Sequence, residues 1–247
     1  MPFLEATNLH KTYSLGRRNK VYALRGVDMS IESGEMVAIM GPSGCGKSTL
    51  MHILGLLHGP DQDLDPPATL TINGNDVTGI SEKVRTRMRA SNMGFVFQSF
   101  NLVPTLTAAE NVALPATYSG CKRAEASAAA SEALDWVGLG EWAGHRPMEL
   151  SGGQQQRVAI ARAQVTKPDL LLADEPTGNL DSASTTEVLD LLRRFNEENG
   201  QTIVIVTHDA VVGDACGRVL TMLDGVIADA PAGLTAPHPK TLRIRSG

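Results

Sequence analysis

Residues 41–49, GPSGCGKST, combine residue types that bind phosphate groups, in a spacing that matches G-x-x-x-x-G-K-[ST]. Glycines let backbone N–H groups face phosphate oxygens, and the start of the following helix adds a partial positive charge. Lys47 would reach the β- and γ-phosphates, and the Ser48 hydroxyl would hold Mg²⁺. A chance glycine-rich turn is the alternative, but the apolar run before the motif and the helical pattern after it favour a phosphate loop. The expected phosphate-loop residues are Gly41, Pro42, Ser43, Gly44, Cys45, Gly46, Lys47, Ser48 and Thr49.

Two carboxylates, Asp174 and Glu175, end the apolar run LLLA. Acidic residues at a strand end can simply be solvated, but a phosphate loop upstream gives them the pattern of a phosphate-loop NTPase. Asp174 would then be a Mg²⁺ ligand, and Glu175 would act as the general base toward the attacking water. Adjacent carboxylates repel each other unless a cation is close, and Mg²⁺ would supply that cation.

His208 and Gln98 follow two further apolar runs, IVIVT and FVF. His208 precedes Asp209, and from that position it could contact the γ-phosphate or orient the attacking water. Gln98 has a side-chain oxygen that could join the Mg²⁺ shell, although the residues alone leave this role open. A lone histidine is usually structural or solvated, and this interpretation applies to the other five histidines: His10, His52, His58, His145 and His238.

A second motif with phosphate-binding residue types, LSGGQQQR, occupies residues 150–157. It has a serine and two glycines at the start of a predicted helix, but it has no lysine. Such a cradle has donors for an anion without the cationic groups that would form a complete site. The alternative is an ordinary serine-capped helix start.

The intervening sequence predicts the elements that position these motifs. Leu4–Tyr13 and Tyr22–Ile31 alternate as antiparallel strands do. Apolar runs predict buried strands within 36–40, 95–98, 169–176, 202–209 and 218–225, and 69–74 reads as a strand that ends in an Asn-Gly turn. Helical patterns occupy 49–57, 81–92, a stretch beginning near Gly153, and 184–199 with Gly200 as C-cap. The segment 106–138 is alanine-rich and helical.

Apolar strands that alternate with helices imply an α/β fold with a parallel sheet covered on both faces. Ligands of such sheets bind at the carboxyl ends of the strands. GPSGCGKST, the pair Asp174–Glu175 and His208 all follow apolar runs, so we expect them to share one site.

Composition limits the partners and the compartment. The net charge is −5, which provides no basic field for non-specific nucleic-acid binding. Three cysteines argue against a disulfide framework and suit a reducing compartment. The chain start lacks the pattern of a signal peptide, and no apolar stretch approaches the roughly 20 residues of a membrane span. We therefore expect any work at a membrane to proceed through a partner.

Together these motifs resemble the ATP-binding subunit of ABC transporters. The chain shows in family order the Walker A loop 41–49, the Q-loop Gln98, the signature 150–157, the Walker B run 170–175, the D-loop 179–181 and the switch His208. The resemblance extends from about residue 4 to 228 and implies a phosphate-loop NTPase fold with a RecA-like parallel-sheet core, an N-terminal antiparallel β subdomain and an inserted α-helical subdomain. It implies one ATP-binding domain over 1–230, with the core at about 1–97 and 165–230 and the helical subdomain at about 98–164. A short, flexible tail is expected at 231–247.

The resemblance also implies partners and roles. Two ATP-binding subunits, a homodimer or a pair with a second such subunit, would enclose ATP and Mg²⁺ head to tail. Ser151, Gly152, Gly153 and Gln154 of one subunit would cap the γ-phosphate held by the other, and Asp181 would cross the interface. Tyr13 would stack on adenine, and transmembrane permease subunits would dock near Gln98–Pro104. The subunit would be cytoplasmic and peripheral on the cytoplasmic face of the cell membrane, without nucleic acid as a partner.

Two stretches, MGFVFQSFNLVPTLTAAENVALP and RPMELSGGQQQRVAIARA, are similar to the branch with lipoprotein-releasing and macrolide-exporting systems. This favours export or lipid-proximal extraction. A soluble ABC ATPase acting on DNA or ribosomes is the competing interpretation, but such proteins carry coiled-coil inserts or two cassettes per chain. A subunit that binds ATP without hydrolysing it is disfavoured by Glu175 and His208. The acidic stretch 60–70 is longer than is usual for the family, and the transported substrate is not encoded in these motifs.

Overall fold

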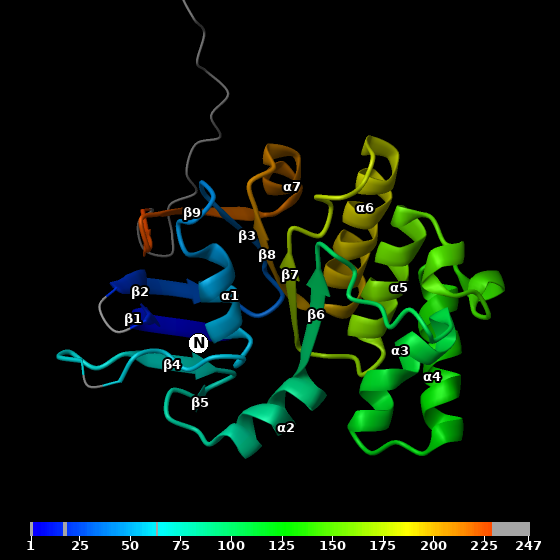
Figure 1. Ribbon diagram of the computed structural model, residues 1–247, viewed down its shortest axis with the longest axis horizontal. Helices are drawn as coiled ribbons and strands as arrows, with labels where there is room; N and C mark the ends of the chain where they lie inside the picture. The colour runs from blue at the N-terminus through cyan, green and yellow to red at the C-terminus, as the bar shows by residue number, and fades with distance from the viewer. Residues whose placement is uncertain (1, 17–18, 63, 229–247) are drawn as a thin grey trace, which may run out of the picture.

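The computed structural model describes residues 2–16, 19–62 and 64–228 (Figure 1). A six-stranded sheet carries the polar motifs that were predicted to follow buried strands. Its strand order is β10-β9-β3-β8-β7-β6, and all neighbours run parallel except β9 and β10. The strands are β3 Met36–Met40, β6 Met93–Phe97, β7 Leu170–Asp174, β8 Thr202–Thr207, β9 Arg218–Leu223 and β10 Val226–Ile227. All six residues of β8 are buried, as expected for a central strand covered on both faces.

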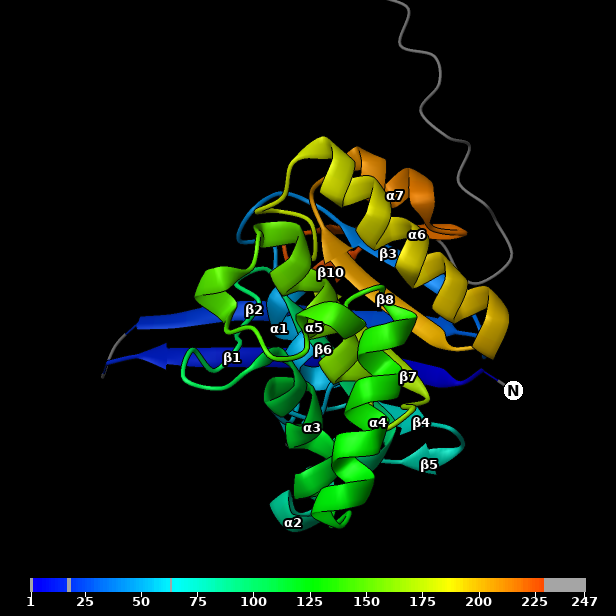
Figure 2. The ribbon, with the colours of Figure 1, turned by 90° about the vertical axis from the view of Figure 1, so that its right-hand side faces the viewer.

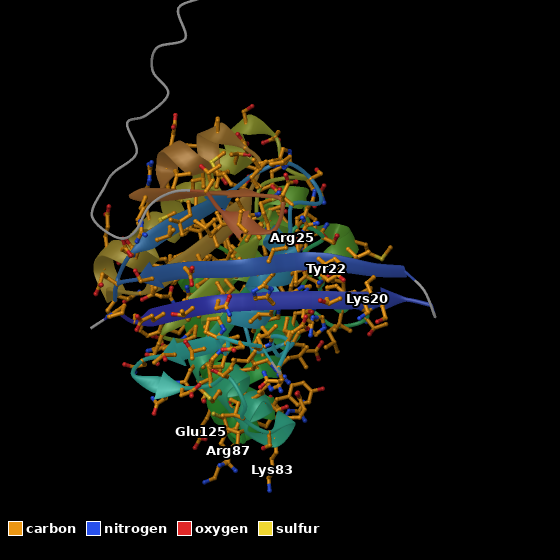
Figure 3. All side chains as sticks on the ribbon, turned by 90° about the vertical axis from the view of Figure 1, so that its left-hand side faces the viewer. Lys20, Tyr22, Arg25, Lys83, Arg87 and Glu125 are labelled. Carbon is orange, nitrogen blue, oxygen red and sulfur yellow. The ribbon has the colours of Figure 1, made fainter. Side chains whose placement is uncertain are left out.

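A second sheet, of order β2-β1-β4-β5, is antiparallel throughout. It contains β1 Leu4–Leu15, β2 Asn19–Ile31, β4 Thr69–Ile72 and β5 Asn75–Asp76. Its long ribbon of β1 and β2 presents Lys20, Tyr22 and Arg25 along β2 (Figure 3). This sheet corresponds to the antiparallel strands predicted from the alternating N-terminal sequence.

Helices cover the two faces of the parallel sheet differently. The α-helices are α1 Lys47–Leu54, α2 Glu82–Asn92, α3 Ala108–Tyr118, α4 Arg123–Trp136, α5 Gly152–Gln164, α6 Ser182–Asn199 and α7 Ala210–Ala215. Two 3₁₀ turns, Gly140–Trp142 and Pro147–Glu149, precede α5. Figures 1 and 2 show α3, α4 and α5 gathered on one side of the sheet and the antiparallel sheet on the other.

Alternate residues of each central strand supply the two cores. Leu172 of β7 and Val204 of β8 pack with α1 and the antiparallel sheet. Leu171 and Ile203, one position away, pack with the helices on the opposite face. The period of two along a strand produces this division, because successive side chains point to opposite faces.

The structure confirms the predicted strands and helices, with bounds that differ by a few residues. The alanine-rich segment forms α3 and α4, and Gly200 ends α6 in the left-handed conformation at φ 61°. The elements that were not predicted are all short: the helix α7, the two-residue strands β5 and β10, and the two 3₁₀ turns. The predicted tail 231–247 lies outside the described residues. Across the described ranges, no helix is both long enough and apolar enough to cross a membrane.

Candidate functional site

Four segments with polar side chains meet at one edge of the parallel sheet. The phosphate loop follows β3, Asp174 ends β7, His208 follows β8, and Gln98 follows β6. The strand ends are in register, since Met40 pairs with Thr207, Asp174 with Val206, and Phe97 with Asp174. The structure therefore brings the polar motifs to the shared edge that their positions after apolar runs predicted.

The phosphate loop is shaped by glycines that no other residue type replaces without strain. Gly44 and Gly46 have φ values of 82° and 109°, in the region that favours glycine. Gly46 also lies against the backbone carbonyl of Ala23, where a Cβ atom would collide with it. The loop consequently exposes its N–H groups at the start of α1, which suits an anion.

Lys47 is held inside its own loop. Its ammonium group donates to the carbonyl oxygens of Gly41 at 2.7 Å and Pro42 at 3.0 Å, and the residue is 8% exposed. Both acceptors are neutral, so the positive charge of the ammonium group is not paired within the loop and can interact with an entering phosphate. Beneath the loop, Cys45 is buried, and its carbonyl accepts from Gly225 N at 3.0 Å. The Cys45 side chain is thus part of the packed core below the predicted phosphate site.

Ser48 and Asp174 supply oxygen atoms side by side. The Ser48 hydroxyl donates to Asp174 Oδ1 at 3.4 Å. Burial raises the pKa of Asp174, and the nearby carboxylate of Glu175 adds to the rise. A divalent cation would offset both effects. A hydroxyl and a single carboxylate fit Mg²⁺, because this ion usually retains several waters.

Glu175 is fixed by its backbone and by both carboxylate oxygens. Its φ is 46°, an uncommon value for a residue other than glycine, and its N–H donates to Val206 O at 2.8 Å. Oε2 accepts from the Thr207 hydroxyl at 3.0 Å, and Oε1 lies 2.6 Å from His208 Nδ1. The Glu175 side chain is 16% exposed and that of His208 is 67% exposed. A partly buried carboxylate held beside an exposed imidazole is a suitable arrangement for activating a water molecule.

Gln98 is tied to the D-loop in this structure. Its side-chain amide donates to Asn179 Oδ1 at 3.3 Å, and its backbone carbonyl accepts from Asn179 Nδ2 at 3.0 Å. Gly178 lies so close that a Cβ atom there would be 2.7 Å from Gln98 Nε2. The Gln98 side chain, for which we predicted a metal role, is therefore engaged by Asn179 of the D-loop in this structure.

The signature segment forms the start of α5. Ser151 is the N-cap: its hydroxyl accepts from Gln154 N at 3.2 Å, and Gln154 Oε1 accepts from Ser151 N at 2.9 Å. The alternative of a serine-capped helix is thus also met, and the two interpretations are compatible. Gly153 packs against α6, where a Cβ atom would lie 2.6 Å from Ser184 Oγ.

Asp181 and Tyr13 occupy positions away from the carboxylate pair. Asp181 is the N-cap of α6 and accepts from Ser184 N at 2.8 Å. Tyr13 lies on β1 and its hydroxyl is 3.1 Å from His58 Nδ1. The Lys11 ammonium lies 5.8 Å from the centre of the Tyr13 ring. These contacts leave the predicted interface and adenine roles as proposals.

Sequence reasoning missed two side chains that contact the catalytic segment. Thr207 bonds to Glu175, and Gln156 donates to the carbonyl of Pro176 at 2.5 Å. The position of Thr207 directly before His208 was an available signal, because it shares the strand end with the predicted site. Gln156 gave no such signal, since its partner is 20 residues distant and depends on the packing of α5.

The fold and this edge together define a phosphate-loop ATPase. Residues 24–178 match the family model described as ABC transporter. The chain is 45% identical over 224 residues to the lipoprotein-releasing system ATP-binding protein LolD 2 of Caulobacter vibrioides, which covers 91% of this chain and 96% of that protein. It is 45% identical over 229 residues to the macrolide export ATP-binding/permease protein MacB of Syntrophobacter fumaroxidans, which covers 92% of this chain but 31% of that protein. The chain therefore spans less than a third of the MacB relative and nearly all of the LolD relative.

Solved structures agree in fold. The dimeric structure of the bacterial ABC transporter cassette MJ0796 has a TM-score of 0.83 and 41% identity, over 92% of this chain and 97% of that one. A dimeric post-hydrolysis state of the same cassette, bound to ADP and Pi, gives the same values. The chain thus belongs to the ABC transporter family. It is an ATP-binding and ATP-hydrolysing subunit of an ABC transporter and uses ATP and Mg²⁺.

Proposed function

We propose that two copies of this chain, or this chain and a second ATP-binding subunit, enclose ATP head to tail and drive separate permease subunits. This proposal rests on a difference between two helix starts in the residues that they offer to a phosphate group. The start of α1 carries Lys47 and lies beside Asp174, whereas the start of α5 offers an exposed Ser151 and two glycines without a cation. The second helix start can complete a phosphate site but cannot form one.

Within each site, the chain's own residues divide the chemistry. Lys47 would exchange its loop carbonyls for the β- and γ-phosphates. Ser48 and Asp174 would hold Mg²⁺, which would supply positive charge beside the phosphate oxygens. Glu175 accepts a proton from the attacking water, while His208 and Thr207 hold its carboxylate. We propose that Tyr13 stacks on adenine, that Gln98 reports on the metal shell, and that Asp181 supports the opposite site.

A groove beside the Gln98 segment suits a permease element. A cavity of about 470 Å³ lies between α2, β6 and the helices α3 and α5, and it is lined in part by Leu57, Phe95, Phe97 and Pro115. Arg162 of the same lining donates to the carbonyls of Asn101 at 2.6 Å and Phe100 at 2.9 Å. The apolar lining next to the segment Gln98–Pro104 supports docking of a transmembrane subunit there, on the cytoplasmic face of a cell membrane.

Shared packing supports one ATP-binding domain over residues 1–230. The helices of the segment 98–164 bury residues such as Val112 and Leu134 in the same core as Leu171 of β7. We propose that this segment is a helical subdomain of that domain, inserted between core parts at about 1–97 and 165–230.

The transport direction is proposed from the relatives. LolD 2 is named as part of a lipoprotein-releasing system, and MacB as a macrolide export protein. The first name describes the release of lipoproteins and the second the export of macrolides. We accordingly propose export or lipid-proximal extraction, with the cargo selected by the permease subunits.

Mixing two defective variants tests the head-to-tail site. Ser151→Arg disables the α5 cradle, and Lys47→Ala disables the phosphate loop, so each variant alone should hydrolyse ATP poorly. A mixed dimer contains one composite site with an intact loop from one chain and an intact cradle from the other. Hydrolysis by the mixture should therefore exceed the sum of the two separate proteins, at a level that rises with total concentration. A mixture no more active than that sum contradicts the proposal.

A further inference from the structure

Gln156 is a completely buried amide inside the motif that begins α5. Its relative exposure is 0%, and its Nε2 donates to the Pro176 carbonyl at 2.5 Å. Within the described part of the chain, Gln156 Oε1 is buried without a hydrogen-bond partner. An apolar side chain of similar volume would fill this space without an unpaired oxygen. Packing alone therefore does not explain a glutamine here. An apolar side chain at this position would lose the hydrogen bond to Pro176.

The acceptor of this bond lies directly after the proposed general base. Glu175 has a φ of 46° and is the first residue of a tight turn in which Gly178 N donates to Glu175 O at 3.1 Å. A residue held in the left-handed region persists only when its surroundings fix it. The contacts that fix this turn come from Val206 on β8 and, through Pro176, from Gln156 on α5.

The donor side of the bond belongs to the helix that begins with the Ser151 cradle. Gly152 and Gly153 precede Gln156 on α5; Gly152 lies next to Asn179 and Leu180, and Gly153 packs against Ser184 of α6. A Cβ atom on Gly152 would lie 3.8 Å from the Asn179 carbonyl oxygen. The start of α5 is thus connected to the segment 176–179 by the neighbourhood of Gly152 and Asn179 and by one buried hydrogen bond.

We infer that Gln156 is a positioning residue that couples the α5 cradle of a chain to the Glu175 carboxylate of the same chain. This inference rests on the proposed function, in which the cradle binds the γ-phosphate held by the partner. Phosphate bound at the start of α5 fixes that helix, and the Gln156–Pro176 bond then fixes the turn that aims Glu175. Each chain would thereby hydrolyse its own ATP fastest when its cradle is occupied by the ATP of its partner.

The test compares Gln156→Met with Gln164→Met on the full chain. Methionine keeps the length of the side chain but removes the amide. Gln164 lies on the same helix, is 8% exposed, and shares a reciprocal amide pair with Gln201 at 2.5 and 3.0 Å. Both changes remove the hydrogen bonding of a buried side-chain amide on α5, but only Gln156→Met removes the hydrogen bond to Pro176. Steady-state hydrolysis should show kcat lowered about 10-fold or more by Gln156→Met with KM for ATP within about 2-fold. Gln164→Met should change kcat less than about 2-fold while lowering the melting temperature.

A double-mutant cycle separates coupling from general damage. Ser151→Ala removes the hydroxyl of the cradle, so Gln156→Met added to it should reduce kcat by less than about 3-fold, because the coupled group is already disabled. An undiminished loss in that background would overturn the inference, as would a kcat for Gln156→Met within about 2-fold of the parent. If Gln156→Met fails to fold, Gln156→Asn, whose shorter amide cannot span to Pro176, is measured by the same criteria. Glu175→Gln serves as a reference: hydrolysis at the parent rate by that variant would overturn the proposed function, and this inference with it.

Discussion

At the scale of single residues, the site is preorganised by hydrogen bonds among its own polar groups. Lys47 is bound by two loop carbonyls, and the Glu175 carboxylate is held by Thr207 and His208. The sequence predicted the type and order of the main residues, since each follows an apolar run. Thr207 was missed although it directly precedes His208, because a threonine that ends a strand such as IVIVT also matches ordinary β-propensity.

Removing the imidazole of His208 tests the carboxylate arrangement. His208→Ala deletes the contact of 2.6 Å to Glu175 and should lower kcat by roughly 10- to 100-fold with little change in ATP affinity. Thr207→Val preserves shape but removes the other bond, and a loss of about 3- to 10-fold is expected. Steady-state hydrolysis and nucleotide titration measure the two quantities. Unchanged kcat in His208→Ala would exclude the assigned role.

Two glycines of the phosphate loop give a graded prediction. Gly44→Ala adds only the strain of a positive φ, because the space around it is open. Gly46→Ala adds the same strain and a collision with the Ala23 carbonyl. Nucleotide titration should therefore show a larger loss of ATP affinity for Gly46→Ala than for Gly44→Ala. Equal losses would mean that the backbone of Ala23 does not constrain the loop.

At the scale of elements, the sequence predicted the strands and long helices, because their patterns are local. Buried runs of four or five apolar residues identified β3, β7 and β8, and an amphipathic period identified α6. The helix α7 has six residues and β10 has two, lengths at which periodicity carries little signal. The pairing of α5 with the segment after β7 depends on tertiary packing and had no local signature.

The start of α6 allows its structural and functional roles to be separated. Asp181 caps this helix, so Asp181→Ala should lower the melting temperature by roughly 2–4 °C, whereas Asp181→Asn keeps an acceptor oxygen and should lower it less. If Asp181 also supports the opposite site through its charge, Asp181→Asn should lower ATP hydrolysis more than Asp181→Ala lowers it through lost stability alone. Parent-like hydrolysis by Asp181→Asn would limit the residue to capping.

The stabilising effect of Asp181 has a defined pH dependence. The backbone hydrogen bond from Ser184 is the first cause that lowers the pKa of Asp181 below its ordinary value of 3.8. A carboxylate with a lowered folded-state pKa contributes stability that is full above its unfolded value and is lost as the pH falls through the folded value. The difference in melting temperature between the parent and Asp181→Ala should be full at neutral pH and shrink below about pH 3.8. A difference independent of pH would show that charge plays no part in the cap.

At the scale of the whole molecule, one edge of the parallel sheet gathers the proposed catalytic groups, while the start of α5 is the proposed second anion cradle. The start of α5 contacts the segment after β7 and also exposes Ser151. An ATP-binding chain of this architecture has one complete phosphate loop and one incomplete cradle. Two chains placed head to tail would complete two sites, and hydrolysis would remove the γ-phosphate that joins them.

The decisive measurement is the size in solution of Glu175→Gln with and without Mg-ATP. This variant should retain ATP but stop hydrolysis, so the closed dimer would accumulate. Light scattering should show twice the chain mass of 26.2 kDa only when Mg-ATP is present. The double variant Glu175→Gln with Ser151→Arg should bind ATP and remain at the monomer mass. A Glu175→Gln protein that binds Mg-ATP and remains monomeric, or a dimer unaffected by Ser151→Arg, would contradict the head-to-tail ATP site.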